Sequence, residues 1–186
     1  IGGNPGLTIK GKEQAEALAQ FFCAKKISYI FTSSKIRTKR TAEAIASKQD
    51  YCRIIALKEF DEINAGICEG MTYAEIEKKM PDVFRAREAN KYAYAYPEGE
   101  SYATMKPRIE EGIKKAFFLN RHSHNIMIIG HQAVNRLILS HFLYRREVDV
   151  PYIYIPQDRF YHIVSMQNKK LFELKRYDKY FYKKTA

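Results

Sequence analysis

The sequence predicts an α/β protein with three layers, in which a mostly parallel sheet is covered by helices on both faces. Two observations indicate this class: short apolar runs alternate with amphipathic stretches, and two of these runs end in glycine or small polar residues. The chain has 186 residues, of which 46% are hydrophobic, so it can bury one sizeable core. With 13% aromatic residues, a mainly disordered chain is excluded.

The first third of the chain predicts two helices and two strands. Apolar residues recur at helical spacing from Ala15 to Phe22, and the apolar run Tyr29-Ile30-Phe31 ends in Thr32-Ser33-Ser34. The predicted elements are a helix at about 8–25, a strand at 29–31, a helix at about 38–48 and a strand at 53–57.

The remainder predicts more helices, one further buried strand and a terminal strand pair. Thr72 and Glu75 form a capping box, and Pro81 begins the next helical turn. The later predicted elements are a loop at 92–99, a helix at about 101–121, a strand at 126–129, a helix through 134–142, and two strands at about 159–166 and 170–175 around a turn at Asn168.

Charge and cysteine content limit the classes of protein that fit. The net charge of +11 indicates an anionic partner, although the basic run 169–184 is most typical of a solvated end. Three widely spaced cysteines disfavour a disulfide scaffold and favour a reducing compartment. No apolar run approaches ~18 residues, so we expect no membrane span.

Two predicted strand ends carry groups that bind phosphate. Ligands of open α/β sheets collect outside the carboxyl ends of the strands. One strand leads to Arg37 in the first turn of a helix, and another leads to His131 and Gln132, which open the helix that carries Arg136. Helix-terminal N–H groups beside cationic side chains are suited to holding a phosphate group.

Other polar clusters leave alternatives open. Glu59, Asp61 and Glu62 follow a strand, where they are either a solvated loop or the source of a general acid. Arg87 and Lys91 are four residues apart and are predicted to share a helix face, with several tyrosines following. This group fits a clamp for single-stranded nucleic acid, a site for a sugar phosphate, or a plain surface helix.

Four segments occur in an order that matches one known family. They are 32–45 (TSSKIRTKRTAEAI), 62–76 (EINAGICEGMTYAEI), 91–102 (KYAYAYPEGESY) and 130–136 (GHQAVNR). Together they resemble the bisphosphatase domain of the 6-phosphofructo-2-kinase/fructose-2,6-bisphosphatase family, within the phosphoglycerate mutase-like histidine phosphatase superfamily. From this resemblance we expect one such domain over residues 1–176, lacking its first strand, and a basic C-terminal tail at 177–186.

The resemblance implies a reaction in two steps, without a metal or cofactor. A histidine takes the 2-phosphoryl group of fructose 2,6-bisphosphate, and water then releases inorganic phosphate and leaves fructose 6-phosphate. By resemblance, Arg37 and His131 stabilise the transferring phosphoryl oxygens, and Glu62 protonates the departing sugar oxygen. By resemblance also, the sugar and its 6-phosphate are held by Ile1, Tyr73, Arg87, Lys91, Tyr102, Gln132 and Arg136.

The chain departs from the family pattern at several points. In the family the nucleophilic histidine lies in an Arg-His-Gly element upstream of the position that matches Ile1, so the printed chain alone is expected to be inactive. Asn64 stands where aspartate is usual, and Gly70 stands where glutamate is common. Ala93 and Ala95 replace arginines that the family often places between the tyrosines.

The favoured interpretation is the phosphatase domain of a bifunctional, cytoplasmic enzyme with a covalently linked kinase domain upstream, and with neither nucleic acid nor membrane as a partner. A broader sugar-phosphate phosphatase of the same superfamily is one alternative. A catalytically inactive pseudo-phosphatase that binds phosphosugars is another. A nucleic-acid binder is the last, and it requires tight binding that weakens steeply with salt.

Overall fold

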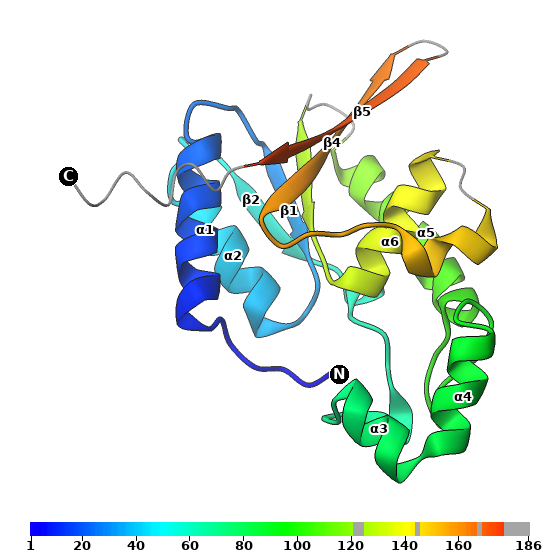
Figure 1. Cartoon of the computed structure of the whole chain (residues 1–186). Coiled ribbons are helices and arrows are strands. Elements are labelled where there is room, and N and C mark those ends of the chain that lie inside the picture. The colour runs from blue at the N-terminus through cyan, green and yellow to red at the C-terminus, as the bar shows by residue number, and fades with distance from the viewer. Residues whose placement is uncertain (121–124, 144–145, 167–168, 177–186) are drawn as a thin grey trace. The chain divides into compact units, whose positions relative to one another are not determined.

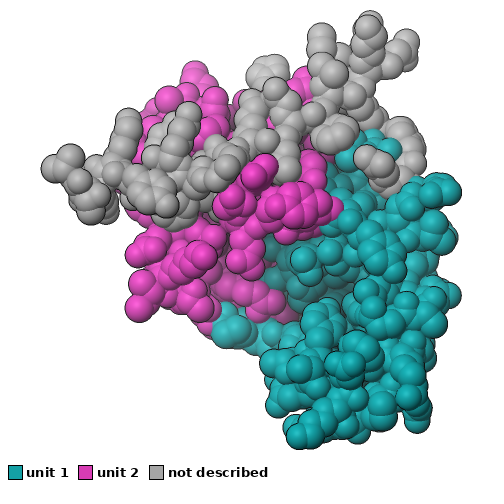
Figure 2. All heavy atoms as spheres, in the orientation of Figure 1, with its two compact units in different colours: residues 1–5, 57–119, 130–153 teal, residues 6–56, 120–129, 154–186 magenta. Residues whose placement is uncertain are grey.

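The chain folds into a parallel sheet, flanking helices and an antiparallel strand pair in the computed structural model, which describes residues 1–120, 125–143, 146–166 and 169–176 (Figure 1). The chain divides into two compact units, each assembled from three stretches of sequence (Figure 2). The sheet unit comprises residues 6–56, 120–129 and 154–186, and the helical unit comprises residues 1–5, 57–119 and 130–153.

The sheet unit contains three parallel strands with β1 in the centre. Its elements are α1 (Ile9–Phe22), β1 (Tyr29–Thr32), α2 (Ile36–Ala46), β2 (Arg53–Ala56), β3 (Ile126–Ile129), β4 (Arg159–Met166) and β5 (Lys169–Arg176). β1 pairs with β2 on one side and β3 on the other, so that Ile30 lies opposite both Ile54 and Met127. β4 and β5 pair in antiparallel fashion.

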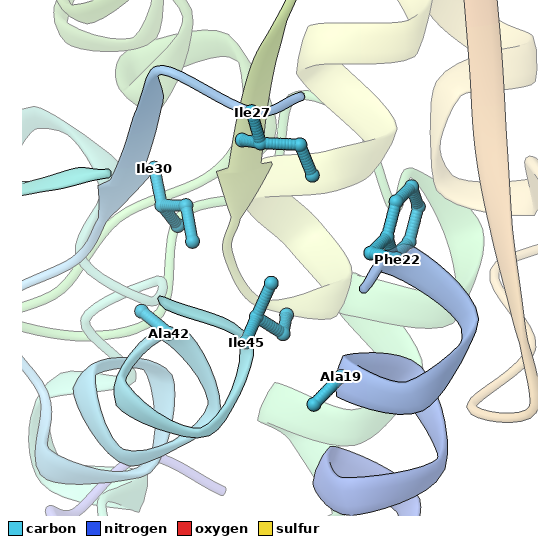
Figure 3. Close-up of a cluster of buried hydrophobic side chains, with 6 residues drawn as sticks. All are labelled: Ala19, Phe22, Ile27, Ile30, Ala42 and Ile45. Atoms are coloured by element: carbon cyan, nitrogen blue, oxygen red, sulfur yellow. The ribbon is translucent and has the colours of Figure 1, made fainter. Parts of the chain in front are cut away.

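A cluster of small and β-branched side chains joins α1 and α2 to β1. Figure 3 shows this core, which consists of Ala19, Phe22, Ile27, Ile30, Ala42 and Ile45. The alanines let the two helices approach closely, and Ile30 and Ile45 are completely buried. The edge of the cluster is aromatic, because Phe21 and Phe22 both contact the ring of Phe160.

The helical unit holds the remaining elements. They are the short 3-10 helices η1 (Lys58–Phe60), η2 (Gly66–Cys68) and η3 (Glu147–Tyr152), and the α-helices α3 (Tyr73–Lys79), α4 (Pro81–Ala89), α5 (Tyr102–Leu119) and α6 (Gln132–Leu143). The predicted capping box is confirmed, since Thr72 and Glu75 each bind the other's backbone N–H at the start of α3. Gly112 of α5 faces Phe60, and a Cβ there would lie 2.6 Å from the ring.

The predicted α/β class, with a parallel sheet flanked by helices, is confirmed, and the main differences lie at helix ends. α5 begins at Tyr102 because Ser101 and Thr104 exchange hydrogen bonds between side chain and backbone. The predicted turn at Asn168 and the predicted tail at 177–186 lie outside the described residues. The domain boundaries stay a prediction.

No helix in the described part of the chain is both long and apolar enough to cross a membrane.

The core of the sheet unit predicts a large cost for truncating Ile45. Ile45→Ala should lower the free energy of unfolding by about 2–5 kcal/mol, because it leaves a cavity between α1, α2 and β1. Ile9→Ala is a matched control, since Ile9 is 80% exposed in the first turn of α1. Urea unfolding of both variants measures the difference, and equal losses would contradict the packing described here.

Candidate active site

One pocket in the helical unit gathers most of the residues predicted for the site. The predicted residues that line it are Ile1, Glu62, Tyr73, Arg87, Tyr102 and Gln132. Ile63, Tyr96 and Ala133 complete the lining. All of these residues belong to the helical unit, so the pocket is formed within that unit.

Glu62, which lines this pocket, lies next to His131. The Nδ1 atom of His131 is 3.9 Å from the Oε2 atom of Glu62, and both side chains are largely buried. The other carboxylate oxygen of Glu62 accepts a hydrogen bond from the backbone N–H of Ile63 at 3.0 Å. A carboxyl group and an imidazole thus share one partly dehydrated place, where proton transfer and charge stabilisation can be combined.

His131 is placed by the start of α6. Its carbonyl accepts a hydrogen bond from Asn135 N–H at 2.8 Å, which closes the first turn of the helix. Gly130 immediately before it leaves room for the Asn135 side chain, whose Oδ1 atom would lie 2.6 Å from a Cβ at this position. Gln132 and Ala133 of the same turn line the pocket, so the positive end of the helix dipole lies beside it.

An ion pair between Arg108 and Glu100 holds the segment that carries Glu62. Arg108 donates from Nε and Nη2 to the two oxygens of Glu100, each at 2.8 Å. Its Nη1 donates to the carbonyls of Glu59 and Asp61, at 2.7 and 2.8 Å. Glu100 also accepts the N–H of Asn64 at 2.9 Å. The backbone is therefore fixed on both sides of Glu62.

The neighbouring carboxylate Glu59 forms an ion pair with Lys115 and does not belong to the pocket. Its side chain pairs with Lys115, and this hydrogen bond lowers the pKa of Glu59. Glu59 does not line the pocket, and a carboxyl group with a lowered pKa is a poor proton donor near neutral pH. Of the three clustered carboxylates Glu59, Asp61 and Glu62, Glu62 is the one that lines the pocket.

Arg87 lies against two aromatic rings. The centre of its guanidinium is 5.2 Å from the ring centroid of Tyr73 and 5.5 Å from that of Tyr96. The side chain is 14% exposed, so the charge is kept near the pocket by cation–π contacts. Planar guanidinium groups held in this way bind phosphate oxygens in a fixed geometry.

Tyr96 and Tyr102 of the pocket are neutral hydrogen-bonding groups at physiological pH. Burial raises the pKa of Tyr96 and also that of Tyr102, although nearby arginines oppose the shift. Arg136 donates to the Tyr102 hydroxyl at 2.9 Å and to the carbonyl of Ile153 at 3.0 Å. Arg136 therefore orients Tyr102, whose own O–H is available to donate to a ligand oxygen.

Lys91 does not share a helix face with Arg87, and that prediction is wrong. α4 ends at Ala89 because Asn90 leaves the helical conformation, with φ −148° and ψ 74°, and its side chain accepts the N–H of Ala93. Lys91 therefore lies in the following turn. Its Nζ atom is 2.8 Å from a Glu88 oxygen and 5.4 Å from the ring centroid of Tyr152.

Arg37 is the one predicted site residue that lies in the sheet unit. It is the second residue of α2, in the first turn as predicted, two residues after the N-cap residue Lys35. Its role with the phosphoryl group stays a prediction.

Two residues near the pocket were missed by the sequence analysis. Glu88 contacts both Arg87 and Lys91, and a glutamate between two predicted phosphate-binding cations is a signal that could have identified it. Nothing in the sequence around Arg108 indicates its role, because the pattern is the same as for any surface arginine in a helix. Within the described residues, no group of three histidine, cysteine, aspartate or glutamate side chains could hold a metal ion.

A parallel α/β fold with a pocket lined by a carboxylate and an arginine, and with a histidine beside that carboxylate, is typical of enzymes that act on phosphate esters. The particular family follows from sequence: the model of the Histidine phosphatase superfamily (branch 1) matches residues 2–178, and the chain belongs to this superfamily.

The chain is also similar to bifunctional enzymes. It is 40% identical over 158 residues to "6-phosphofructo-2-kinase/fructose-2,6-bisphosphatase 1" of Homo sapiens and 39% identical to the Gallus gallus "6-phosphofructo-2-kinase/fructose-2,6-bisphosphatase". Each match covers 84% of this chain and 32% of the relative. The chain therefore spans about a third of the length of these curated relatives.

Solved structures support the fold. The alpha-ribazole phosphatase from Shigella flexneri has a TM-score of 0.81 and 21% identity, covering 95% of this chain and 87% of its own. A mycobacterial glucosyl-3-phosphoglycerate phosphatase with inorganic phosphate has a TM-score of 0.75 and 17% identity, covering 92% and 86%. At this level of identity the likeness concerns the fold alone.

The network around Arg108 predicts a loss of stability when its charge is removed. Arg108→Met should lower the free energy of unfolding by about 3 kcal/mol, because Glu100 and two carbonyls lose their partner in a largely buried position. The control is Arg85→Met on α4, whose ion pair with Asp82 is exposed and should contribute no more than ~1 kcal/mol. If urea midpoints fall equally for both, the Arg108 network contributes no more than a surface pair.

Proposed function

We propose that this chain is the phosphatase domain that hydrolyses the 2-phosphate of fructose 2,6-bisphosphate, giving fructose 6-phosphate and inorganic phosphate. Membership of the histidine phosphatase superfamily and the similarity to fructose-2,6-bisphosphatase relatives support this activity. The chain matches only about a third of the length of those relatives. The proposed substrate and activity therefore rest on the residues of the site as well.

One observation carries the proposal: Glu62, beside His131, lines the same pocket as Arg87, which lies against two tyrosine rings. A sugar with two phosphates needs a proton donor at the phosphate that leaves and a fixed cation at the phosphate that stays. Glu62 supplies the first group and Arg87 the second. Tyr102 and Gln132 are the neutral hydrogen-bonding groups suited to the sugar between them.

In the first step, a nucleophilic histidine forms a bond to phosphorus while the bond from phosphorus to the sugar O2 breaks. The nucleophile in this proposal belongs to an Arg-His-Gly element outside the printed residues. Glu62 gives its proton to O2, so the sugar leaves as a neutral alcohol. His131 holds equatorial phosphoryl oxygens, where charge must be stabilised as the group transfers.

In the second step, water attacks the phosphohistidine. The Glu62 carboxylate takes a proton from the water, a bond from oxygen to phosphorus forms, and the bond from histidine to phosphorus breaks. Glu62 is protonated again and the nucleophile is restored, so the cycle closes. Positive side chains supply the charge stabilisation, and in this proposal the reaction uses no metal or cofactor.

The natural partners follow from the same proposal. The relatives' names describe bifunctional enzymes, which supports a kinase domain linked covalently to this one. Such an enzyme acts on phosphorylated sugars in the cytoplasm, and we place this protein there.

A broader sugar-phosphate phosphatase is the second candidate, and one observation favours it. Ala93 and Ala95 stand where related bisphosphatases often carry arginines, so the segment beside Lys91 offers fewer cations for a second phosphate. Comparable kcat/KM values for sugar monophosphates and for fructose 2,6-bisphosphate would favour this candidate.

Replacing Glu62 tests the general acid. In a form of the protein that carries the Arg-His-Gly element, Glu62→Gln should slow hydrolysis of fructose 2,6-bisphosphate by at least ~100-fold, because O2 loses its proton donor. An aryl phosphate with a good leaving group needs little protonation, so its turnover should fall much less. A loss under ~3-fold with the sugar substrate would assign the acid to another residue.

Replacing Arg87 tests the site of the 6-phosphate. Charge-assisted hydrogen bonds contribute ~1.5–3 kcal/mol, so Arg87→Ala should weaken fructose 6-phosphate binding about tenfold or more in calorimetric titration. Arg85→Ala is the control on the same helix, because its side chain is 73% exposed and does not line the pocket. Equal affinities for the wild type and Arg87→Ala would remove Arg87 from the site.

A further inference from the structure

A carboxylate occupies the place between the two cations assigned to the 6-phosphate. The Oε1 atom of Glu88 is 3.3 Å from Nη1 of Arg87, and its Oε2 atom is 2.8 Å from Nζ of Lys91. Glu88 thus binds both cations, with one oxygen for each. This is the contact that two oxygens of a phosphate group would make.

The exposures show which of the three side chains can move. Arg87 is 14% exposed and Lys91 is 23% exposed, and each also lies over a tyrosine ring. Glu88 is 40% exposed, the largest exposed fraction of the three side chains. A ligand anion that reaches these cations therefore meets fixed positive charges and a carboxylate with free space on its solvent side.

We propose that Glu88 is an internal competitor of the substrate phosphate, and that it limits how tightly the pocket holds the 6-phosphate. The inference rests on the proposed function, because it takes Arg87 and Lys91 as the cations that receive this phosphate. When the phosphate binds, Glu88 gives up its contacts with both cations, or it stays and repels the incoming dianion. In both cases its charge weakens binding.

Competition between Glu88 and the phosphate group benefits an enzyme whose product retains the 6-phosphate. Fructose 6-phosphate and the substrate present the same phosphate to the same cations, so every gain in ground-state affinity also slows product release. A carboxylate that returns to Arg87 and Lys91 restores their charge balance as the product leaves. Glu88 therefore sets an affinity that permits turnover.

A positioning role for Glu88 has the opposite consequence. If Glu88 mainly holds Arg87 and Lys91 in their binding geometry, removing its charge loosens both cations and weakens phosphate binding. The sign of the change in affinity therefore separates the two roles, and a merely structural role does not give tighter binding.

The decisive variant is Glu88→Gln, which keeps the shape of the side chain and removes its charge. At ~5 Å, one carboxylate charge acting on a phosphate dianion corresponds to about a tenfold change in affinity even in high dielectric. Glu88→Gln should therefore bind fructose 6-phosphate about tenfold more tightly in calorimetric titration. In a form of the protein that carries the Arg-His-Gly element, fructose 6-phosphate should also inhibit the phosphatase activity of this variant at lower concentration.

Two controls separate the local contact from the change in net charge. Asp82→Asn removes one negative charge from the same helix, where Asp82 pairs with Arg85, and should leave the affinity within ~2-fold. Glu88→Asp keeps the charge and should remain close to the wild type. In an Arg87→Ala background the gain from Glu88→Gln should shrink, because one of the two contested cations is gone.

Unchanged or weaker binding of fructose 6-phosphate by Glu88→Gln overturns the inference. If the wild type binds no fructose 6-phosphate, the proposed function fails instead, and inorganic phosphate is then the probe for Glu88. Tighter binding of inorganic phosphate by Glu88→Gln still supports competition. Equal or absent binding by both proteins overturns it.

Discussion

The candidate site depends on the ion pair between Arg108 and Glu100, because the segment around Glu62 has no regular secondary structure to fix it. Backbone groups outside helices and strands need other partners when water is excluded. Arg108 and Glu100 provide these partners on both sides of Glu62, at the Asp61 carbonyl and the Asn64 N–H. These hydrogen bonds position Glu62 on its loop without a helix or strand.

The same network explains why the departure at Asn64 is compatible with the fold. The Asn64 side chain accepts the N–H of Gly66 at 2.8 Å, a bond that an aspartate oxygen would make equally well. The backbone carbonyl of Asn64 accepts the N–H of Glu100, so the contact with the 97–100 turn is made by the backbone. Gly70 has φ +81°, where a residue without a side chain is the least strained. Both departures keep the backbone of the loop.

How far the sequence predicts this molecule depends on whether a feature is local. Periodicity and the Thr72–Glu75 capping box gave the helices and strands, because the interactions that decide them lie within a few residues. Family motifs gave six residues that share one pocket. The predicted shared helix face of Arg87 and Lys91 was wrong, because Asn90 leaves the helical conformation, accepts the N–H of Ala93 with its side chain and ends the helix. Arg108 could not be identified, since its partners lie 8 to 49 residues away in the chain.

The net charge of +11 describes the chain as a whole, while affinity for an anion is decided at the pocket. There the cations are already engaged: Arg87 and Lys91 contact Glu88, and Arg136 binds Tyr102 and the Ile153 carbonyl. A phosphate must replace an existing contact to gain a new one, so the net gain is the difference between two charge-assisted interactions. A basic chain attracts phosphorylated ligands from a distance, whereas the paired side chains of its pocket determine which of them it retains and for how long.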